Sequence, residues 1–241
     1  MTSDTKPKKK KLRVRKKELT RQAILEAAEE FFSKNPMDEV NLEDIAEAAV
    51  VSRTTLYNYF KNKDAIFFGL GIQLMNDTNT YYEETYPDDR PGKEQVLELC
   101  RRYRKIGRDR PLIYAIVREF YMRINSQSIP LREMKAKILK SRGSPRFENL
   151  LETSEEPYLI EFYAQLLRYT DVWTEVIKKG KSDGSITNDL DDIQIALFIF
   201  MLNSGMEGEM NLRRATLGNI EFDKSNIIEN TLDLIASFLK K

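Results

Sequence analysis

The 241-residue sequence contains no histidine and a single cysteine, Cys100. The absence of histidine removes the usual general base and the commonest transition-metal ligand. One cysteine cannot form an intramolecular disulfide, and a zinc site built from cysteine and histidine is excluded, although carboxylate sites for hard cations stay open. Cys100 follows Leu97 and Leu99 on a predicted helix, which favours a small buried apolar residue over a redox sensor.

Long hydrophobic runs are also absent. The longest is "IALFIFML" at 195–202, and eight residues are far fewer than the ~20 that a membrane-spanning helix needs. There is no signal-like segment, which together with the lone cysteine predicts an intracellular location. No glycine-rich phosphate loop, cofactor fingerprint or nucleophile context is present, so the sequence predicts neither an enzyme nor a cofactor.

Charge is unevenly distributed along the chain. Residues 1–22 hold ten Lys or Arg against two acids, a net of +8, whereas the whole chain carries +1 and the remainder therefore carries −7. A basic end on a mildly acidic body favours a polyanionic partner at that end. Three interpretations of the basic segment stay open: contact with DNA backbone or minor groove, an inert solvated tail, and a nuclear import signal in "PKKKK".

Apolar residues recur at helical spacing, and we find no strand with period-two alternation. The sequence therefore predicts an all-α fold, with a mobile basic arm over 1–18, a head of three short helices over 19–66 and a helical body over 67–241. Residues 126–154 are less regular. The expected helices are 20–34, 42–49, 53–61, 63–86, 93–108, 111–125, 156–180, 190–213 and 225–240.

The stretch "SRTTLYNYFKNK" at 52–63 has three bases, two tyrosines, three hydroxyls and no acid. On a helical projection Leu56 and Phe60 share one side, and Thr54, Asn58 and Lys61 lie opposite. Hydroxyls, amides, aromatics and bases are the groups that contact phosphates and base edges in the major groove. A short helix capped by Asn41, a tight turn and then this helix predict a helix-turn-helix.

The string "RQAILEAAEEFF…VNLEDIAEAAVVSRTTLYNYFKNKDAI" resembles the amino-terminal domain of TetR-family transcriptional regulators over 21–66. The resemblance implies a homodimer with two such heads that binds a palindromic operator in double-stranded DNA, without a membrane, in a prokaryotic cytoplasm. It also implies an all-α body that binds a small molecule and thereby lowers operator affinity. The expected DNA-binding residues are Asn41, Leu42, Ser52, Arg53, Thr54, Thr55, Tyr57, Asn58, Tyr59, Lys61 and Lys63.

The turn departs from the family pattern at one position. The family usually has Ala-Gly-Val-Ser, and here the string is Ala49-Val50-Val51-Ser52. Glycine serves in such a turn because it tolerates a positive φ, which a β-branched residue resists. The sequence therefore predicts either strain at Val50 or an altered turn.

The body offers two further expectations. Two apolar helices near the carboxyl end predict a four-helix dimer interface, with an intrachain core as the alternative; its expected residues are Ile193, Leu197, Phe200, Met201, Ser204, Ile228, Leu232 and Ile235. Aromatic stripes favour a core, or an apolar and aromatic effector pocket. The candidate pocket residues are Tyr103, Tyr114, Val117, Phe120, Tyr121, Phe162, Leu166, Tyr169 and Trp173.

The helix-turn-helix pattern predicts a sequence-specific DNA-binding regulator, and the family resemblance implies a repressor that a small-molecule effector releases from its operator. The alternative is an architectural or ligand-independent DNA-binding protein led by the basic arm. The ratio of specific to non-specific affinity at fixed salt separates the two.

Overall fold

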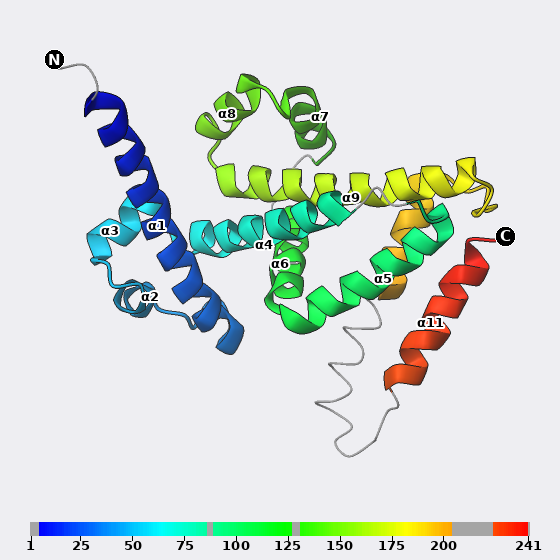
Figure 1. Ribbon diagram of the computed structural model, residues 1–241. Helices are drawn as coiled ribbons and strands as arrows, with labels where there is room; N and C mark the ends of the chain where they lie inside the picture. Colours follow the sequence, from blue (N-terminus) through cyan, green and yellow to red (C-terminus); the bar gives the residue numbers. More distant parts are fainter. Residues whose placement is uncertain (1–4, 86–88, 127–130, 204–223, 241) are drawn as a thin grey trace. The chain divides into compact units, whose positions relative to one another are not determined.

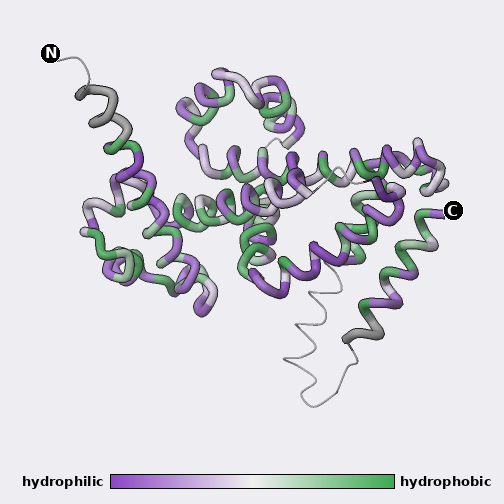
Figure 2. The backbone as a smooth tube through the Cα atoms, viewed as in Figure 1, coloured by the Kyte–Doolittle hydropathy of each residue, from purple (hydrophilic) through white to green (hydrophobic). Residues whose placement is uncertain are grey.

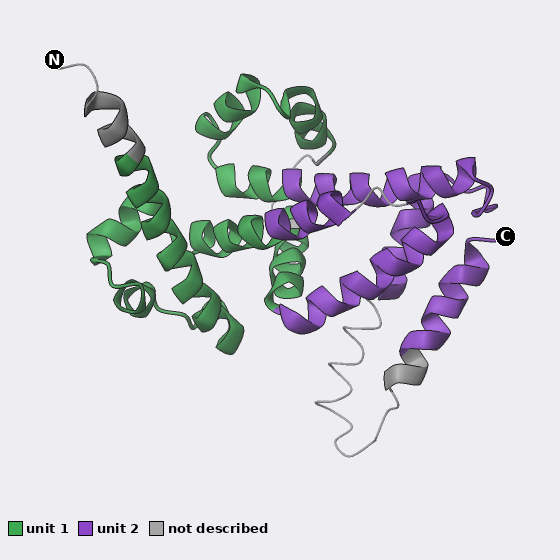
Figure 3. Cartoon of the chain, viewed as in Figure 1, with its two compact units in different colours: residues 1–74, 112–163 green, residues 75–111, 164–241 purple. Residues whose placement is uncertain are grey.

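The computed structural model describes residues 5–85, 89–126, 131–203 and 224–240, and all regular structure in these ranges is helical (Figure 1). The predicted all-α class is confirmed. The chain divides into two compact units, Met1–Leu74 with Leu112–Tyr163 and Met75–Pro111 with Ala164–Lys241 (Figure 3). Within the described ranges, no helix has the length and apolar character that crossing a bilayer requires.

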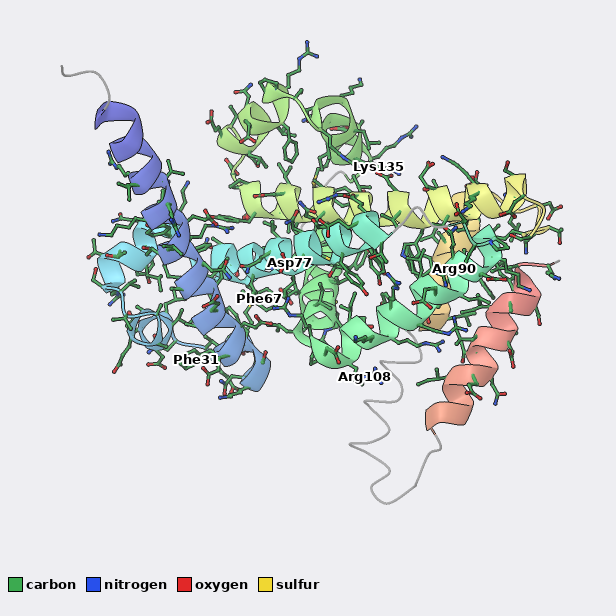
Figure 4. The ribbon with its side chains drawn as sticks, in the orientation of Figure 1. Phe31, Phe67, Asp77, Arg90, Arg108 and Lys135 are labelled. Atoms are coloured by element: carbon green, nitrogen blue, oxygen red, sulfur yellow. The ribbon has the colours of Figure 1, made fainter. Side chains whose placement is uncertain are left out.

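The first unit begins with the head. Its helices are α1 (Thr5–Lys34), α2 (Leu42–Ala48), α3 (Arg53–Tyr59) and the beginning of α4 (Lys63–Thr85). Each of these helices contributes apolar side chains to the core of the head, where the stripes predicted from periodicity meet. The buried residues include Ile24, Leu25, Ala28, Ile45, Leu56, Phe60 and Ile66. Figure 4 labels Phe67 on α4, whose ring meets that of Phe32 on α1 edge to face at 5.1 Å.

The composition predicts an irregular arm over 1–18, but the structure continues α1 back to Thr5. Lysine and arginine are good helix formers, and residues 8–19 contain neither glycine nor proline. Pro7 lies in the first turn, where its missing N–H has no intrahelical partner to lose. Residues 12–19 are all exposed.

The rest of the first unit consists of α6 (Leu112–Ser126), α7 (Leu131–Ser141), α8 (Pro145–Glu152) and the beginning of α9 (Pro157–Ser182). The stretch predicted as irregular thus contains two helices, separated at Arg142–Ser144, where Gly143 has φ +73° and Ser144 caps α8. A Cβ on Gly71 of α4 would lie 2.6 Å from Ile116, so glycine there lets α4 and α6 approach closely.

The second unit contains the end of α4, α5 (Gly92–Asp109), the rest of α9, a helix described over 192–203, and α11 (Lys224–Phe238). Apolar and polar residues alternate turn by turn along α11 (Figure 2). The "KGKSDGS" turn after α9 caps α5, because Asp183 Oδ2 and Ser185 Oγ accept the amides of Gly92 and Lys93 at 2.8 and 2.9 Å.

Candidate DNA-binding surface

The two short helices of the head are capped by their own side chains. Asn41 Oδ1 accepts the amide of Glu43 at 3.1 Å, and Ser52 Oγ accepts the amide of Thr55 at 3.0 Å. Each cap satisfies one of the amides that a helix start leaves without a partner. The first residues of α2 and of α3 are therefore fixed by local sequence, as the pattern predicts.

The turn between α2 and α3 is a Schellman motif with valine at the left-handed position. Val50 N donates to Glu47 O at 3.0 Å and Val51 N to Ala46 O at 2.9 Å. Val50 has φ 54°, and among the described non-glycine residues it alone has a positive φ. The turn therefore has the usual glycine conformation, and of the two alternatives from the sequence the structure shows the one in which Val50 adopts a disfavoured positive φ.

Helix α3 buries one narrow edge and exposes the rest. Leu56 and the following Phe60 are fully buried, whereas Arg53, Thr54, Tyr57 and Asn58 are exposed. The exposed groups are a guanidinium, a hydroxyl, a phenol and an amide, with no acid among them. This helix therefore offers hydrogen-bonding groups to a partner along most of its surface, and Lys61 just beyond it is also exposed.

Arg53 is held at the start of α3 by two neighbours. Its guanidinium lies 2.9 Å from Glu43 Oε1 on α2 and 5.6 Å from the centre of the Tyr57 ring. Both partners are exposed, so the ion pair contributes little stability and exchanges readily with another anion. The side chain is therefore available to a partner while its direction is already restricted.

Other predicted DNA-binding residues are half-buried and make contacts inside the head. Thr55 Oγ1 lies 2.8 Å from Ser52 Oγ, and Lys63 Nζ donates to the carbonyl of Asp38 at 2.9 Å. Tyr59 and Leu42 are half-buried. Lys63 thus already ties the start of α4 to the loop before α2, a contact that spans 25 residues and that helical periodicity could not reveal.

The predicted effector residues fall into two aromatic groups, one in each unit. In the first unit Phe120 and Phe162 are fully buried with ring centres 5.3 Å apart, Tyr114 and Val117 are half-buried, and Tyr121 is exposed. In the second unit Trp173 and Tyr169 are buried in edge contact at 6.2 Å. Tyr103 stacks on Tyr169 at 6.5 Å, and Leu166 is half-buried.

The aromatic group of the second unit also contains polar side chains that sequence reasoning missed. Tyr82 is fully buried 5.7 Å from Tyr169, and Asn79, one turn earlier on α4, donates to the carbonyl of Gln165 at 3.1 Å. Burial raises the pKa of Tyr169 well above its usual range, so its hydroxyl stays protonated. The spacing of Asn79 and Tyr82 on one helical face is the signal that could have found them.

Cys100 is buried, and burial raises the pKa of its thiol to about 12. Asn203 Nδ2 lies 3.7 Å from its sulfur, and Arg104, also buried, donates to Asn203 Oδ1 at 3.0 Å. The thiol therefore stays neutral and unreactive.

Some of the predicted dimer residues are exposed in the structure, and others pack inside their own chain. Ile193, Leu197 and Met201 are exposed at four-residue spacing, and Ile228 and Leu232 are half-buried; Ser204 lies outside the described residues. Phe200 instead contacts Trp173 and Tyr169 of its own chain at 5.0 and 5.6 Å, and Ile235 has no exposed surface. Ile235 therefore belongs to the intrachain core, whereas Phe200 is half-buried and packs on aromatic rings of α9.

A family model described as "Bacterial regulatory proteins, tetR family" matches residues 24–70. This segment contains α2, the Schellman turn and α3 in full. The chain carries a TetR-family DNA-binding domain. The resemblance predicted from the sequence is confirmed.

Two curated relatives are similar to this chain over longer segments. The HTH-type dhaKLM operon transcriptional activator DhaS of Lactococcus lactis is 31% identical over 75 residues, 30% of this chain and 40% of that protein. The fatty acid metabolism regulator protein of Bacillus subtilis is 30% identical over 118 residues, 48% of this chain and 59% of that protein. The chain thus spans about two fifths to three fifths of the length of these relatives.

Solved structures of bacterial regulators share the fold over almost the whole chain. The regulator FadR of Bacillus subtilis in complex with stearoyl-CoA has a TM-score of 0.63 at 18% identity, covering 90% of this chain and 98% of that one. A tetR-family regulatory protein from Rhodococcus RHA1 has a TM-score of 0.59 at 14% identity, covering 92% and 97%. At these identities the likeness establishes the fold.

Proposed function

We propose that this protein is a transcriptional repressor that binds operator DNA through α3 and is released by a small-molecule effector. The single observation that carries the DNA-binding part is the exposed surface of α3. Arg53, Thr54, Tyr57 and Asn58 face outward without an acid, while Leu56 fixes the helix in the head. The amino-terminal residues of such a helix reach base edges when it lies in the major groove.

The proposal also includes a homodimer, a palindromic operator and a cytoplasmic location. The exposed stripe of Ile193, Leu197 and Met201 is an apolar face that a second copy of the chain would cover. Two heads related by a two-fold axis match a palindromic operator, whose half-sites repeat the symmetry of the protein. Action on bacterial operator DNA implies a cytoplasmic location.

For the effector we propose a fatty acyl compound. A relative is named a fatty acid metabolism regulator, and a structural neighbour was solved with stearoyl-CoA. Within the second unit, Tyr103 and Trp173 supply apolar rings beside Tyr169, and the hydroxyls of Tyr82 and Tyr169 supply polar groups that such a ligand can contact.

Two alternatives are kept because specific observations favour them. The first alternative is an activator, because the relative DhaS is named one. Whether a bound regulator represses or activates depends on where its operator lies relative to the promoter. The exposed basic residues at 12–19 fit a ligand-independent DNA-binding protein equally well.

The experiment that tests DNA binding begins with selection of bound duplexes from a random library, which yields the operator motif. Against this operator, Arg53→Ala should cost about 1–3 kcal/mol and relax preference at one position in each half-site, because arginine can pair with both guanine acceptors. Lys61→Ala, a matched basic-residue control beside α3, should weaken matched and scrambled duplexes about equally. Recovery of no motif would contradict the proposal, and equal loss on both duplexes in Arg53→Ala would remove the base-reading role.

The effector proposal is tested by thermal unfolding with and without ligand. Palmitoyl-CoA at about 100 times its Kd should raise stability by about 2.7 kcal/mol, because a ligand that binds only the native state stabilises it by mass action. Free coenzyme A is the control for the headgroup. A Tm that neither palmitate nor palmitoyl-CoA changes would favour the ligand-independent alternative.

A further inference from the structure

The segment from Tyr59 to Asp64 joins α3 to α4 and therefore influences the orientation of α3 relative to α4. It is short, and its own bonds are few. Phe60 N donates to Leu56 O at 2.9 Å, and Asn62 Oδ1 accepts the amide of Ala65 at 2.8 Å. Phe60 itself is extended, with φ −137°. Contacts from elsewhere in the chain are needed to fix such a segment.

One such contact comes from α9. The Tyr158 hydroxyl donates to the carbonyl of Tyr59 at 3.2 Å, across 99 residues of sequence. Tyr59 is the last residue of α3, and the last carbonyls of a helix have no partner within the helix. The Tyr158 ring also lies 6.0 Å from the ring of Phe60, which anchors the same end of α3. Tyr158 therefore holds both the backbone and the buried side chain at this end.

A second contact comes from α6. Arg123 Nη1 and Nη2 lie 2.6 and 2.8 Å from the two carboxylate oxygens of Asp64, and Arg123 Nε lies 2.9 Å from Glu119. The guanidinium also covers the ring of Phe68 at 5.4 Å. A two-pronged arginine–carboxylate pair fixes orientation as well as distance. Arg123 therefore fixes the first turn of α4 at the other end of the segment.

The two contacts share one support. Phe120 lies one turn before Arg123 on α6, and Phe162 lies one turn after Tyr158 on α9, and the two rings meet at 5.3 Å. Both phenylalanines are fully buried. Because packed cores are rigid, Tyr158 and Arg123 are presented to the segment by a single framework.

We propose that Tyr158 and Arg123 are positioning residues for operator recognition, which hold α3 in its DNA-reading orientation from outside the head. The inference rests on the proposed DNA-binding function. Neither residue belongs to the exposed surface of α3, so each acts through the placement of that helix. Their loss should lower the preference for the operator and leave the non-specific attraction between the protein and DNA phosphates unchanged.

The first test compares Tyr158→Phe with Tyr163→Phe, the same change on the same helix. Tyr158→Phe removes only the hydroxyl and should lower affinity for the matched operator about threefold to tenfold, the effect of one hydrogen bond. Affinity for scrambled duplex and the salt slope should stay as in wild type. Tyr163→Phe should change none of these, since it keeps the ring that contacts Phe120 at 5.5 Å and leaves the Tyr158 hydroxyl in place.

The second test compares Arg123→Lys with Arg118→Lys, an exposed arginine on the same helix. Lysine keeps the charge and cannot reproduce the two-pronged pair with Asp64. Arg123→Lys should reduce the ratio of matched to scrambled affinity about threefold to tenfold, whereas Arg118→Lys should leave it unchanged. Equal losses on matched and scrambled duplexes in Arg123→Lys would overturn its positioning role.

Hydrogen exchange without DNA separates this inference from the proposed function. In Tyr158→Phe the amide of Phe60, which closes the last turn of α3, should exchange about threefold to tenfold faster than in wild type. Unchanged exchange and an unchanged operator preference would overturn the inference. Faster exchange in a protein that selects no DNA motif would support the contact and contradict the DNA-binding function instead.

Discussion

Val50 stores backbone strain on the surface of the head. Its φ of 54° is disfavoured for a β-branched residue, and its side chain is 91% exposed, so it gains little from packing. The neighbouring Schellman bonds require this conformation at this position, and they hold the turn despite the strain.

Val50→Gly should therefore stabilise the protein. Relief of the left-handed penalty is worth about 1–2 kcal/mol, and the greater freedom of glycine in the unfolded chain offsets about 0.4–1 kcal/mol of it. Urea unfolding should give a net gain between about 0 and 1.6 kcal/mol. Val51→Gly, next in the chain and half-buried, should instead be destabilising. A loss of stability in Val50→Gly would show that the strain is not the dominant contribution.

Glu161 on α9 carries a charge that folding disfavours. Burial raises the pKa of its carboxyl, Arg21 opposes the shift, and Glu148 adds to it. Because the folded pKa lies above the unfolded one, the native state favours the protonated form. Its stabilising contribution is full below the ordinary pKa of 4.5 and is lost as pH rises through the raised value.

Glu161→Gln should therefore raise the Tm at pH 7, and the gain should disappear at about pH 4, where the native carboxyl is protonated. Thermal unfolding at both pH values measures the difference. Glu155→Gln, an exposed position just before α9, serves as the control and should change the Tm at neither pH. A gain of equal size at pH 4 and pH 7 would rule out the ionised carboxylate as its cause.

At the scale of the element, the basic start of α1 is a helix rather than an irregular arm. Exposed Arg13, Arg15, Lys16 and Lys17 lie on a regular scaffold that rises ~1.5 Å per residue. A helix is too wide for the minor groove of B-DNA, so this segment is suited to lie along phosphates. Non-specific attraction is therefore its expected contribution.

Replacing these four residues by glutamine should make the negative slope of log affinity against log salt shallower by up to about 3.6. This is roughly 0.9 for each lost phosphate contact. Glutamine has similar helix propensity, so α1 should stay helical by circular dichroism. Lys135→Gln with Lys137→Gln on α7 is the control, and Figure 4 labels Lys135 away from the head. A slope equal to that of wild type would identify the segment as an inert tail.

At the scale of the whole molecule, a charge placed in the exposed apolar stripe tests the proposed dimer interface. Leu197 is 51% exposed in the protomer, so Leu197→Glu should leave the fold intact and place two charges at a covered interface without partners. Light scattering should report a monomer. Leu139→Glu on α7 is matched in exposure, at 50%, and should remain a dimer. A dimeric Leu197→Glu protein would exclude this stripe as the interface.

The sequence by itself determined the helical class, the position of the head and the two side-chain caps, and it reduced the turn at Val50 to two alternatives. Each of these depends on residues close together in the chain: a stripe at 3.6-residue spacing, Asn41 and Ser52 within three residues of the amides they accept, and Val50 between two short helices. Local physical chemistry is sufficient for such features, which is why the resemblance over 21–66 could be identified from the sequence.

Only the tertiary structure decided which apolar residues face inward and which distant groups meet. Phe200 and Leu197 share one predicted stripe, yet Phe200 packs on Trp173 while Leu197 is exposed, because a wide apolar helix can rotate without changing its pattern. The bonds from Tyr158 to Tyr59 and from Arg123 to Asp64 span 99 and 59 residues. Such contacts arise from the packing of several similar helices at once, and no periodicity within one segment specifies them.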